Sequence, residues 1–436
     1  MTSRIAALQR RLSDGRPQVC VVGQGYVGLT LAAAAAADGM HVTGIDIDSS
    51  RVAALRGGQN VVPGVDDALF ATAMDSERLS FSTDYDAVPN ADVVVICVPT
   101  PITDHRPDLT AIESAGHEVG QRLRRGSLVI LESTTYPGTT EQVLCPLLEG
   151  ARLKAGRDFL LAFSPERIDP GNVKYGLRNT PRVVGGIDPA STQAATTFYS
   201  QLVDEVHPLS SCRAAELAKL LENTFRMVNI ALVNELAMQC KDQGIDTWEV
   251  IRAASTKPFG FMPFYPGPGV GGHCIPLDPT YLAWQSRRDT GRRFRLVELA
   301  QDINAEMPDY VTRRIVDALG ARGVALRDAR VLALGVTYKP NVGDLRESAA
   351  VETLAQLSRR GVRVSFHDPY VDRVRSNGLQ LNRTRLTAKA IAQADAVALL
   401  TPHDQYDLDR VTKHARLVFD ARNALGSRDD DKVVTL

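Results

Sequence analysis

A glycine-rich turn near the beginning of the chain, Gly23-Gln-Gly25-Tyr-Val-Gly28, constrains the fold more than any other feature. It follows a short apolar run at 18–22 and precedes an alanine-rich stretch that favours a helix. A second apolar run at 41–45 ends directly before Asp46, about 20 residues beyond the glycines. Strand, glycine turn, helix, strand and acid in this order predict an α/β unit that binds a dinucleotide.

Each residue of the turn has an expected role. Gly23 permits the tight turn, Gly25 lets the backbone approach a pyrophosphate, and Gly28 lets the helix pack closely on the strand. Tyr26 and Val27 lie between these glycines and are also expected to contact the cofactor, because the helix N-terminus there faces the anion. The alternatives are a related fold that binds FAD or no nucleotide, but no second flavin signature is evident.

Asp46 is expected to determine whether the site prefers NAD or NADP. Its carboxylate should accept hydrogen bonds from the adenosine ribose hydroxyls and repel a 2′-phosphate, which favours NAD over NADP. Arg51 lies close enough in sequence to weaken this preference. Thr100 and Thr134 each follow a predicted strand, where ligands of such sheets bind, although Thr, Pro and Gly are also ordinary turn residues.

The rest of the chain predicts an α/β fold with two Rossmann-like, doubly wound parallel-sheet domains. Further apolar runs alternate with helix-favouring stretches, which indicates strands that are buried on both faces. The stretch 214–244 has a helical period and no Gly or Pro before its last residue, so we expect a long helix that joins domains. The expected domains are residues 1–205, 206–322 and 323–436.

Composition excludes several classes of partner. The chain has 50 basic and 51 acidic residues, so no attraction for nucleic acid or an anionic membrane surface is expected. Its six cysteines are scattered without a Cys-x-x-Cys pair, which argues against a metal site or a disulfide framework and fits a reducing cytoplasm. No membrane-spanning run or signal peptide is evident. The basic, amphipathic start favours a short helix, with an organelle address as the alternative.

A loop rich in glycine and proline carries the candidate nucleophile Cys274, with Asp278 four residues later. A thiolate is the reactive form of cysteine, and a neighbouring cation such as His273 or Lys219 would lower the thiol pKa from about 8.5. The surrounding glycines would let a substrate approach the backbone. The alternative is a buried, inert cysteine, which suits Cys20 and Cys97 within their apolar strands better.

Two further groups of polar residues are candidates for the site. Lys219, Asn223 and Arg226 recur at helical spacing, so they share one face, and a lysine and an asparagine one turn apart can donate to an oxyanion. Glu166 and Arg167 follow the apolar run 159–163, where Glu166 could accept a proton or bind sugar hydroxyls. A solvated polar stripe and a salt-bridged loop are the respective alternatives.

These residues resemble the nucleotide-sugar 6-dehydrogenases, also called the UDP-glucose/UDP-mannuronate dehydrogenase family. The resemblance extends from about Gln18 to the C-terminus. Its markers are Gly23-Gln-Gly-Tyr-Val-Gly28, Glu132-Ser-Thr-Thr-Tyr-Pro-Gly138, Ser164-Pro-Glu-Arg-Ile-Asp-Pro-Gly-Asn172, Gly271-Gly-His-Cys-Ile-Pro-Leu-Asp278, Gly335-Val-Thr-Tyr-Lys-Pro-Asn-Val-Gly-Asp-Leu-Arg346 and Phe419-Asp-Ala-Arg422-Asn.

The resemblance implies a four-electron oxidation with NAD. A sugar C6 alcohol becomes an aldehyde, which Cys274 holds as a thiohemiacetal and then as a thioester, and water releases the uronate. By the same resemblance, Lys219 and Asn223 stabilise oxyanions, and Asp278 and Thr134 help to activate water. Glu166 is implied as an acid or base.

The resemblance also implies how the substrate is held. Lys339 should meet the substrate phosphates or sugar, Arg346 should reach the cofactor, and Arg422 should hold the nucleotide sugar, either within one subunit or across a subunit interface. Tyr265, Gly271, Glu166, Arg167, Lys219, Asn223 and Arg226 complete the expected substrate contacts. The C-terminal domain is implied to bind the nucleotide, and the central helical domain to form a homodimer or a higher homo-oligomer.

The sugar itself is left open. The run 257–269 and the helix segment 223–226 look most like members that oxidise UDP-N-acetylglucosamine or a related UDP-N-acetylhexosamine. UDP-glucose or dTDP-glucose is the alternative within the family. Outside this family, the alternatives are a two-electron NAD-dependent dehydrogenase or epimerase and a nucleotide-sugar sensor. The dehydrogenase or epimerase would have little need of Cys274. The sensor would have little need of the intact set of Cys274, Lys219, Asn223 and Asp278.

Overall fold

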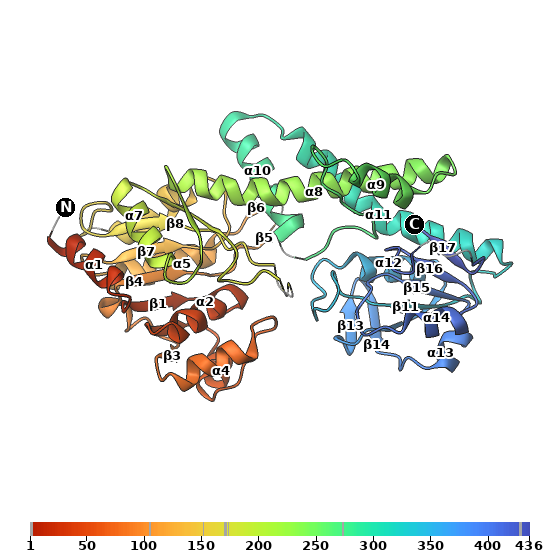
Figure 1. Cartoon of the computed structure of the whole chain (residues 1–436), viewed down its shortest axis with the longest axis horizontal. Helices are drawn as coiled ribbons and strands as arrows, with labels where there is room; N and C mark the ends of the chain where they lie inside the picture. The colour runs from red at the N-terminus through yellow and green to blue at the C-terminus, as the bar shows by residue number, and fades with distance from the viewer. Residues whose placement is uncertain are drawn as a thin grey trace. The chain divides into compact units, whose positions relative to one another are not determined.

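The computed structural model describes residues 3–103, 106–150, 152–169, 172, 174–272, 274–426 and 430–436; the side chains of Ser3 and Cys274, and all of His273, lie outside this description. The chain divides into two compact units, Met1–Glu222 and Asn223–Leu436. In Figure 1 the first unit runs from red to yellow-green and the second from green to blue. Each unit is built around its own sheet, which confirms the predicted pair of Rossmann-like sheets.

The first unit contains an eight-stranded sheet in the order β10-β9-β8-β7-β4-β1-β2-β3. Neighbouring strands run parallel except β8 and β9, which are antiparallel. Strand β1 lies between β2 and β4, so the chain changes direction beside it, and ligands of such sheets bind at this point. The strands are β1 (Gln18–Val22), β2 (His41–Ile45), β3 (Leu79–Ser82), β4 (Val93–Ile96), β7 (Leu128–Leu131), β8 (Leu160–Phe163), β9 (Arg182–Gly186) and β10 (Val206–Leu209).

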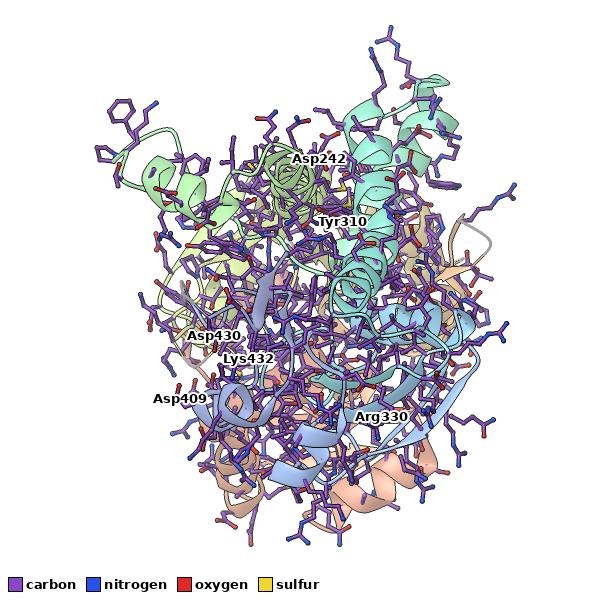
Figure 2. The ribbon with its side chains drawn as sticks, turned by 90° about the vertical axis from the view of Figure 1, so that its right-hand side faces the viewer. Asp242, Tyr310, Arg330, Asp409, Asp430 and Lys432 are labelled. Atoms are coloured by element: carbon purple, nitrogen blue, oxygen red, sulfur yellow. The ribbon has the colours of Figure 1, made fainter. Side chains whose placement is uncertain are left out.

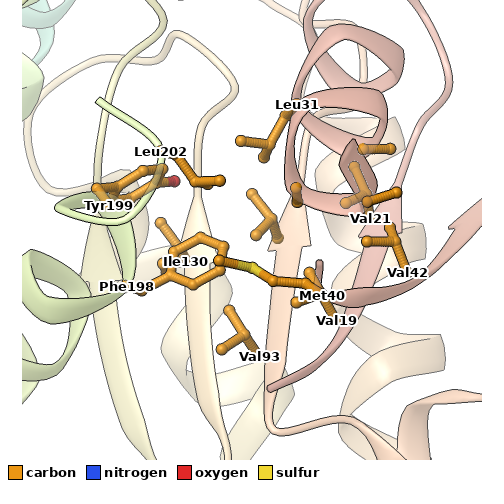
Figure 3. Packing of buried hydrophobic residues seen from close by; sticks show 14 of the residues in the cluster. Val19, Val21, Leu31, Met40, Val42, Val93, Ile130, Phe198, Tyr199 and Leu202 are labelled. Atoms are coloured by element: carbon orange, nitrogen blue, oxygen red, sulfur yellow. The ribbon is translucent and has the colours of Figure 1, made fainter. Parts of the chain in front are cut away.

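Helices bury the strands of this sheet, which explains the continuous apolar runs in the sequence. Figure 3 shows Val21 and Ile130 of the sheet packed with Leu31 of α2 and with Phe198 and Tyr199 of α7. The helices of this unit are α1 (Ser3–Ser13), α2 (Tyr26–Ala37), α3 (Ser49–Arg56), α4 (Asp67–Asp75), α5 (Thr110–Arg122), α6 (Cys145–Glu149) and α7 (Pro189–Tyr199). Two short helical turns, η1 (Val88–Asn90) and η2 (Thr140–Leu144), and a small hairpin, β5 (Ile102–Thr103) with β6 (Arg106–Pro107), complete it.

The second unit contains a five-stranded parallel sheet in the order β12-β11-β15-β16-β17. Helices α11 and α12 cover one face and α13 and α14 the other. Figure 2 labels Tyr310 on α11, Arg330 at the start of β11, and Asp430 with Lys432 just before β17. Its elements are β11 (Arg330–Leu334), α12 (Ala349–Arg359), β12 (Arg363–His367), β13 (Arg373–Ser376), β14 (Leu379–Asn382), α13 (Ala388–Gln393), β15 (Ala396–Leu399), α14 (Leu408–His414), β16 (Val418–Asp420) and β17 (Val433–Thr435).

A long helix, α8 (Cys212–Asp242), continues from the first unit into the second. It matches the stretch 214–244 and ends just before Gly244, which has the positive φ of 69° that glycine tolerates. Helices α9 (Thr247–Ser255), α10 (Cys274–Thr290) and α11 (Arg295–Ala321) follow it. Part of α8 packs with α10 and α11 in a small core that includes Met227, Ala283 and Val297.

One expectation about the backbone is wrong. Cys274 does not lie inside the glycine- and proline-rich loop, because it is the first residue of α10. Pro276 falls in the first turn of that helix, where a missing N–H costs no helical hydrogen bond, and Pro279 is accommodated inside it. Proline therefore indicated a loop where the chain begins a helix.

Candidate active site

The glycine turn has the geometry that its sequence predicts. Gly23 has φ 92°, and a β-carbon there would lie 2.6 Å from the carbonyl oxygen of Cys97. A β-carbon on Gly28 would collide with the carbonyl of Gly23, so helix α2 packs directly on the turn. Gly25 differs, because a β-carbon there would have no described atom within 4 Å. Its open side leaves the start of α2 accessible to an anion.

Asp46 is tied to this turn by hydrogen bonds. Its Oδ2 accepts from the Gln24 N–H at 2.8 Å and its Oδ1 from the Asp48 N–H at 2.9 Å. The guanidinium of Arg51 also donates to Asp46 Oδ2 at 2.8 Å. Arg51 is therefore directed at the carboxylate, which partly neutralises its charge. The turn, Asp46 and the open side of Gly25 together fit the phosphates and ribose of NAD.

Thr100 and Thr134 lie next to each other beyond the ends of β4 and β7. The hydroxyl of Thr100 donates to the carbonyl oxygen of Thr134 at 2.8 Å. Ser133 links the same two turns, because its hydroxyl donates to the Val98 carbonyl at 2.7 Å. Since β4 is the neighbour of β1, both threonine turns lie at the edge of the sheet that carries the glycine turn. Their contact with a cofactor remains a prediction.

Glu166 lies in a salt-bridged loop, the alternative that its sequence left open. Its Oε1 accepts from the backbone N–H groups of Arg167 and Ile168 at 2.6 and 2.7 Å. Its Oε2 lies 3.3 Å from the guanidinium of Arg182. The Arg167 side chain points elsewhere and pairs with Glu222 at 2.7 Å. The carboxylate of Glu166 is thus held at the end of β8, and an acid or base role for it remains a prediction.

Arg182 joins a buried network that sequence reasoning missed. It is 3% exposed and donates to Glu132 at 2.7 Å and to the Ser164 hydroxyl at 3.0 Å. Because β9 runs antiparallel to β8, its first residue comes to the edge where the parallel strands end. Tyr199 donates its hydroxyl to the same carboxylate of Glu132. A charged residue opening an apolar strand run was the signal that could have revealed it, since a buried charge requires partners.

This network keeps the neighbouring thiol protonated. Burial raises the pKa of Glu132, and the charge of Arg182 only partly opposes that shift. Burial, followed by the charge of Glu132, also raises the pKa of Cys97 well above its ordinary range, and the thiol donates to Glu132 at 3.5 Å. Burial similarly raises the pKa of Cys20 to about 12. Neither cysteine has the properties of a nucleophile.

Helix α8 is anchored to the turn that follows β7. Glu216, which is fully buried, accepts hydrogen bonds from the Thr140 hydroxyl at 2.7 Å and the Thr140 N–H at 2.9 Å. One turn later, Lys219 is 8% exposed, and its ammonium has no hydrogen-bond or ion-pair partner among the described residues. Asn223 is also buried, whereas Arg226 is exposed. Of the three predicted residues, Lys219 and Asn223 share the buried side of the helix.

Asn223 and Asp278 come together within the second unit. The side-chain amide of Asn223 donates to Asp278 Oδ2 at 2.5 Å, and Asp278 is 2% exposed. Asp278 lies one helical turn after Cys274 on α10, so the two positions project from the same side of that helix. The Cys274 side chain itself lies outside the described part of the chain. An amide donor beside a buried carboxylate can orient a water molecule or a substrate oxygen.

The loop 265–272 closes onto the loop that follows β11. The Gly272 N–H donates to the Arg346 carbonyl at 2.9 Å, and a β-carbon on Gly271 would lie 2.5 Å from the Glu347 carbonyl. Arg346 is exposed and pairs with Asp344 at 2.6 Å. Tyr265 is 54% exposed and stacks on Trp248 with ring centres 5.9 Å apart. The predicted residues Gly271 and Arg346 are therefore neighbours.

Arg422 has no carboxylate as a counter-charge among the described residues. Its guanidinium lies against Gly267, where a β-carbon would collide with it, and its Nε donates to the Leu400 carbonyl at 3.4 Å. Burial lowers the pKa of Arg422 to about 10. No carboxylate pairs with it within the part of the chain that the structure describes. It lines a small pocket with Gly269, Gly271, Thr337, Tyr338 and Thr401, and such a pocket suits an anionic ligand.

The described residues offer neither a metal site nor a membrane span. No group of three or more histidine, cysteine, aspartate or glutamate side chains among them could hold a metal ion. None of the described helices combines the length and the apolar character that crossing a membrane requires.

Comparisons with known proteins identify the family. Residues 17–203, 213–306 and 332–427 match the NAD binding domain, the central domain and the UDP binding domain of the UDP-glucose/GDP-mannose dehydrogenase family. The UDP-N-acetyl-D-glucosamine 6-dehydrogenase of Pseudomonas aeruginosa is 35% identical over 427 residues, 95% of this chain and 98% of that protein. The UDP-N-acetyl-D-mannosamine dehydrogenase of Escherichia coli K12 is 34% identical over 421 residues, 93% of this chain and 98% of that protein.

Solved structures agree with the sequence comparisons. The UDP-D-ManNAc dehydrogenase of Pyrococcus horikoshii has a TM-score of 0.86 at 31% identity and covers 96% of this chain and 98% of that one. A UDP-glucose dehydrogenase from Pyrobaculum islandicum has a TM-score of 0.83 at 28% identity and covers 96% and 97%. The resemblance seen in the sequence is confirmed: the chain belongs to the UDP-glucose/GDP-mannose dehydrogenase family and is an NAD-dependent oxidoreductase of the nucleotide-sugar dehydrogenase class.

Proposed function

We propose that this enzyme oxidises the C6 alcohol of a UDP-N-acetylhexosamine to the uronate in two successive two-electron steps. The observation that carries the proposal is the hydrogen bond between Asn223 and buried Asp278, one helical turn from Cys274. The names of the relatives from P. aeruginosa and E. coli support an N-acetylhexosamine as the sugar. UDP-N-acetylglucosamine is our first choice among such substrates.

NAD would be held at the edge of the first sheet. Gly23, Gly25, Tyr26, Val27 and Gly28 would surround its pyrophosphate, and Asp46 and Arg51 would meet the adenosine ribose. Thr100, Thr134 and Arg346 would contact the rest of the NAD molecule. When bound, NAD supplies a hydride acceptor for the sugar carbon. Asp46 would still disfavour a ribose that carries a 2′-phosphate, although the pairing of its carboxylate with Arg51 weakens that repulsion.

Lys219 and Asn223 would stabilise oxyanions at the reacting carbon. Each oxidation step places negative charge on the sugar oxygen, and a donor aimed at that oxygen lowers the barrier. Lys219 lies on the buried side of α8 without a described counter-charge, so no carboxylate of the described residues competes with a substrate oxygen for its ammonium. Asn223 adds an amide donor whose orientation is fixed by Asp278.

Cys274 would keep the intermediates bound between the two steps. Its sulfur adds to the aldehyde carbon, and the thiohemiacetal then loses a second hydride and a proton to become a thioester. Water attacks the thioester carbon, the C–S bond breaks, and the thiol and the carboxylate are released. Asp278 would accept a proton from this water, and Thr134 and Glu166 would help to hold the water and the sugar hydroxyls.

The nucleotide end of the substrate would bind in the second unit. Arg422 and Lys339 would contact the diphosphate, and no described carboxylate pairs with Arg422 in the small pocket that it lines with Gly271. Tyr265, Arg167 and Arg226 complete the proposed contacts. We retain the division into residues 1–205, 206–322 and 323–436 as the proposed domains for NAD, for the catalytic cysteine and for the nucleotide.

A homodimer is proposed from the surface of α8. Leu217, Leu221, Phe225 and Leu232 are 44–63% exposed and fall on one side of the helix, away from Lys219 and Asn223. A stripe of large apolar side chains suits a self-complementary interface between two copies. Sedimentation of the chain should give twice the mass of 47.3 kDa, and Leu221→Glu should give the monomer.

The experiment that tests the function counts NADH. Run to completion on UDP-N-acetylglucosamine, UDP-N-acetylmannosamine, UDP-glucose and dTDP-glucose, the enzyme should release two NADH per sugar on one of them and yield the uronate mass. Cys274→Ala should abolish the uronate. Cys145→Ala is the matched control, since burial raises the pKa of that thiol to about 11, and it should behave as wild type. One NADH or none on every sugar would contradict the proposal.

A further inference from the structure

A buried histidine–aspartate pair lies beneath the loop that carries Lys339. His403 is 2% exposed and Asp368 is fully buried, and His403 Nε2 lies 3.0 Å from Asp368 Oδ2. The loop follows β11, Asp368 follows β12 and His403 follows β15, and these three strands are neighbours in the sheet. Their carboxyl ends therefore bring the pair and the loop together.

The hydrogen bonds fix which imidazole nitrogen carries the proton. The Asn341 backbone N–H donates to His403 Nδ1 at 2.9 Å, so Nδ1 is an acceptor without a proton. The proton is then on Nε2, which donates to Asp368. Asp368 is in turn held by the Val336 N–H at 2.8 Å and the Tyr370 N–H at 2.9 Å. The neutral imidazole thus connects the backbone of the loop to a fixed carboxylate.

Lys339 lies between two fastened points of this loop. On one side, the Thr401 hydroxyl donates to the Thr337 carbonyl at 2.7 Å, and the Thr337 hydroxyl donates to the Lys339 carbonyl at 3.0 Å. On the other side, Asn341 has φ 63°, a left-handed conformation that asparagine tolerates better than most residues. The bond from its N–H to His403 supports that conformation.

Aromatic rings hold the imidazole in place. The ring centres of Tyr370 and Tyr406 lie 5.1 and 5.5 Å from that of His403. The Tyr406 hydroxyl donates to the His367 carbonyl at 2.9 Å, a bond that does not involve the loop. Tyr406 also has a hydrogen bond with the backbone of Gly335 at the start of the loop, but it contributes to the cluster without a described hydrogen bond to Lys339 or Asn341.

We propose that His403, oriented by Asp368, is a positioning residue for the substrate diphosphate: by fixing the backbone at Asn341 it aims Lys339 at the phosphates. This inference rests on the proposed function, in which Lys339 binds the nucleotide sugar. It assigns His403 no contact with the substrate. Its effect should fall on the affinity for UDP and on KM for the nucleotide sugar, with kcat and KM for NAD unchanged.

Three substitutions separate the contacts of the two imidazole nitrogens, which are Nδ1 with the Asn341 N–H, and Nε2 with Asp368 and, at 3.3 Å, with the Thr337 hydroxyl. His403→Phe keeps a ring and loses all of these contacts, so UDP affinity measured by calorimetry should fall about tenfold, as expected for the lost hydrogen bond to the loop backbone. His403→Asn places an amide oxygen near the position of Nδ1 and should restore most of that affinity. His403→Gln keeps a donor toward Asp368 but not the acceptor for Asn341, and should resemble the Phe variant. Tyr406→Phe is the matched control and should lower the melting temperature while leaving UDP affinity as in wild type.

A double variant tests whether the effect passes through Lys339. In a Lys339→Ala background, His403→Phe should cause no further loss of UDP affinity, because the side chain that it positions is gone. Equal losses in the two backgrounds would overturn the inference, as would wild-type UDP affinity in a folded His403→Phe enzyme. A wild-type enzyme that neither binds UDP nor releases NADH would instead overturn the proposed function, and the inference with it.

Discussion

Each of the two sheets brings an arginine to the edge where its strands end, and the surroundings of the two arginines differ. In the first unit, Arg182 lies between the carboxylates of Glu132 and Glu166. In the second, Arg422 lies against Gly267 and a backbone carbonyl, and no carboxylate of the described residues pairs with it. Burial alone would lower the pKa of both, but the two glutamates raise that of Arg182 above its ordinary value, whereas the pKa of Arg422 falls to about 10.

We infer that this difference separates a cation that stabilises the fold from one that binds an anionic ligand. A buried charge that pairs with carboxylates of its own chain needs no further counter-charge. Removing it leaves those carboxylates buried without a cation, which lowers the stability of the folded state. A half-buried charge without such partners, as at Arg422, costs less, and the binding of an anion would offset that cost. The comparison can be tested on stability and on binding separately.

The largest expected effect follows from Arg182→Met. This change leaves two buried carboxylates without their cation, and we expect the free energy of unfolding to fall by about 3–5 kcal/mol. Urea unfolding monitored by circular dichroism measures it. A loss below about 1 kcal/mol would show that the network is hydrated and would remove the contrast with Arg422.

Arg422→Met should have the opposite profile. Because no described carboxylate depends on Arg422, we expect its unfolding free energy to stay within about 1 kcal/mol of wild type. Its KM for the nucleotide sugar should rise about thirtyfold, the loss expected for one charge-assisted contact of about 2 kcal/mol. Initial rates across sugar concentrations measure the change. A large loss of stability with an unchanged KM would place Arg422 in the same class as Arg182.

The smallest expected effect is a difference in how pH acts on two buried carboxylates. Burial alone would raise the pKa of Asp368, but hydrogen bonds from His403, Val336 and Tyr370 lower it overall. Asp368 therefore contributes stability above its ordinary pKa of about 4, and that contribution is lost as pH falls through its lower folded value. Glu132 has a raised pKa, so the folded state binds the extra proton and loses stability as pH rises from about 4 to that raised value.

Unfolding measured from pH 3 to pH 8 distinguishes the two carboxylates. Asp368→Asn should be less stable than wild type by about 1–3 kcal/mol at neutral pH, with the gap closing at the acidic end. Glu132→Gln should match wild type near pH 4 and lose less stability as pH rises. Parallel curves for all three proteins would mean that neither carboxylate titrates differently in the folded and unfolded chain.

The sequence predicted those features that depend on neighbouring residues. The glycine turn, the first strands and helix α8 follow from local spacing, and each lies where its pattern indicated. The same reasoning placed Cys274 in a loop because glycine and proline are frequent around it, and it could not tell that Pro276 and Pro279 fit within α10. The sequence analysis also grouped Arg226 with Lys219 and Asn223 on one helix face, but Arg226 is exposed. Helical spacing shows which residues share a face, and it does not show how much of that face is buried.

The contacts that assemble the candidate site are long-range. Asn223 and Asp278 are separated by 55 residues, Arg182 and Glu132 by 50, and His403 and Asp368 by 35. No local pattern encodes which polar residues meet across such distances, because the packing of the sheet decides it. A charged residue within an apolar strand, as at Arg182, indicates only that some partner must exist.

In the proposed function, helix α8 presents catalytic residues on one side and a dimer interface on the other, and both proposed roles would limit how its sequence can change. Each inserted residue would turn everything after it by about 100°. A single insertion after Lys219 would move Asn223 out of line with it and would also split the stripe of Leu217, Leu221, Phe225 and Leu232. If both proposed roles hold, chimaeras made from two members of the family should tolerate length changes in surface loops but not within α8, where one helical register would serve both the catalytic residues and the dimer interface.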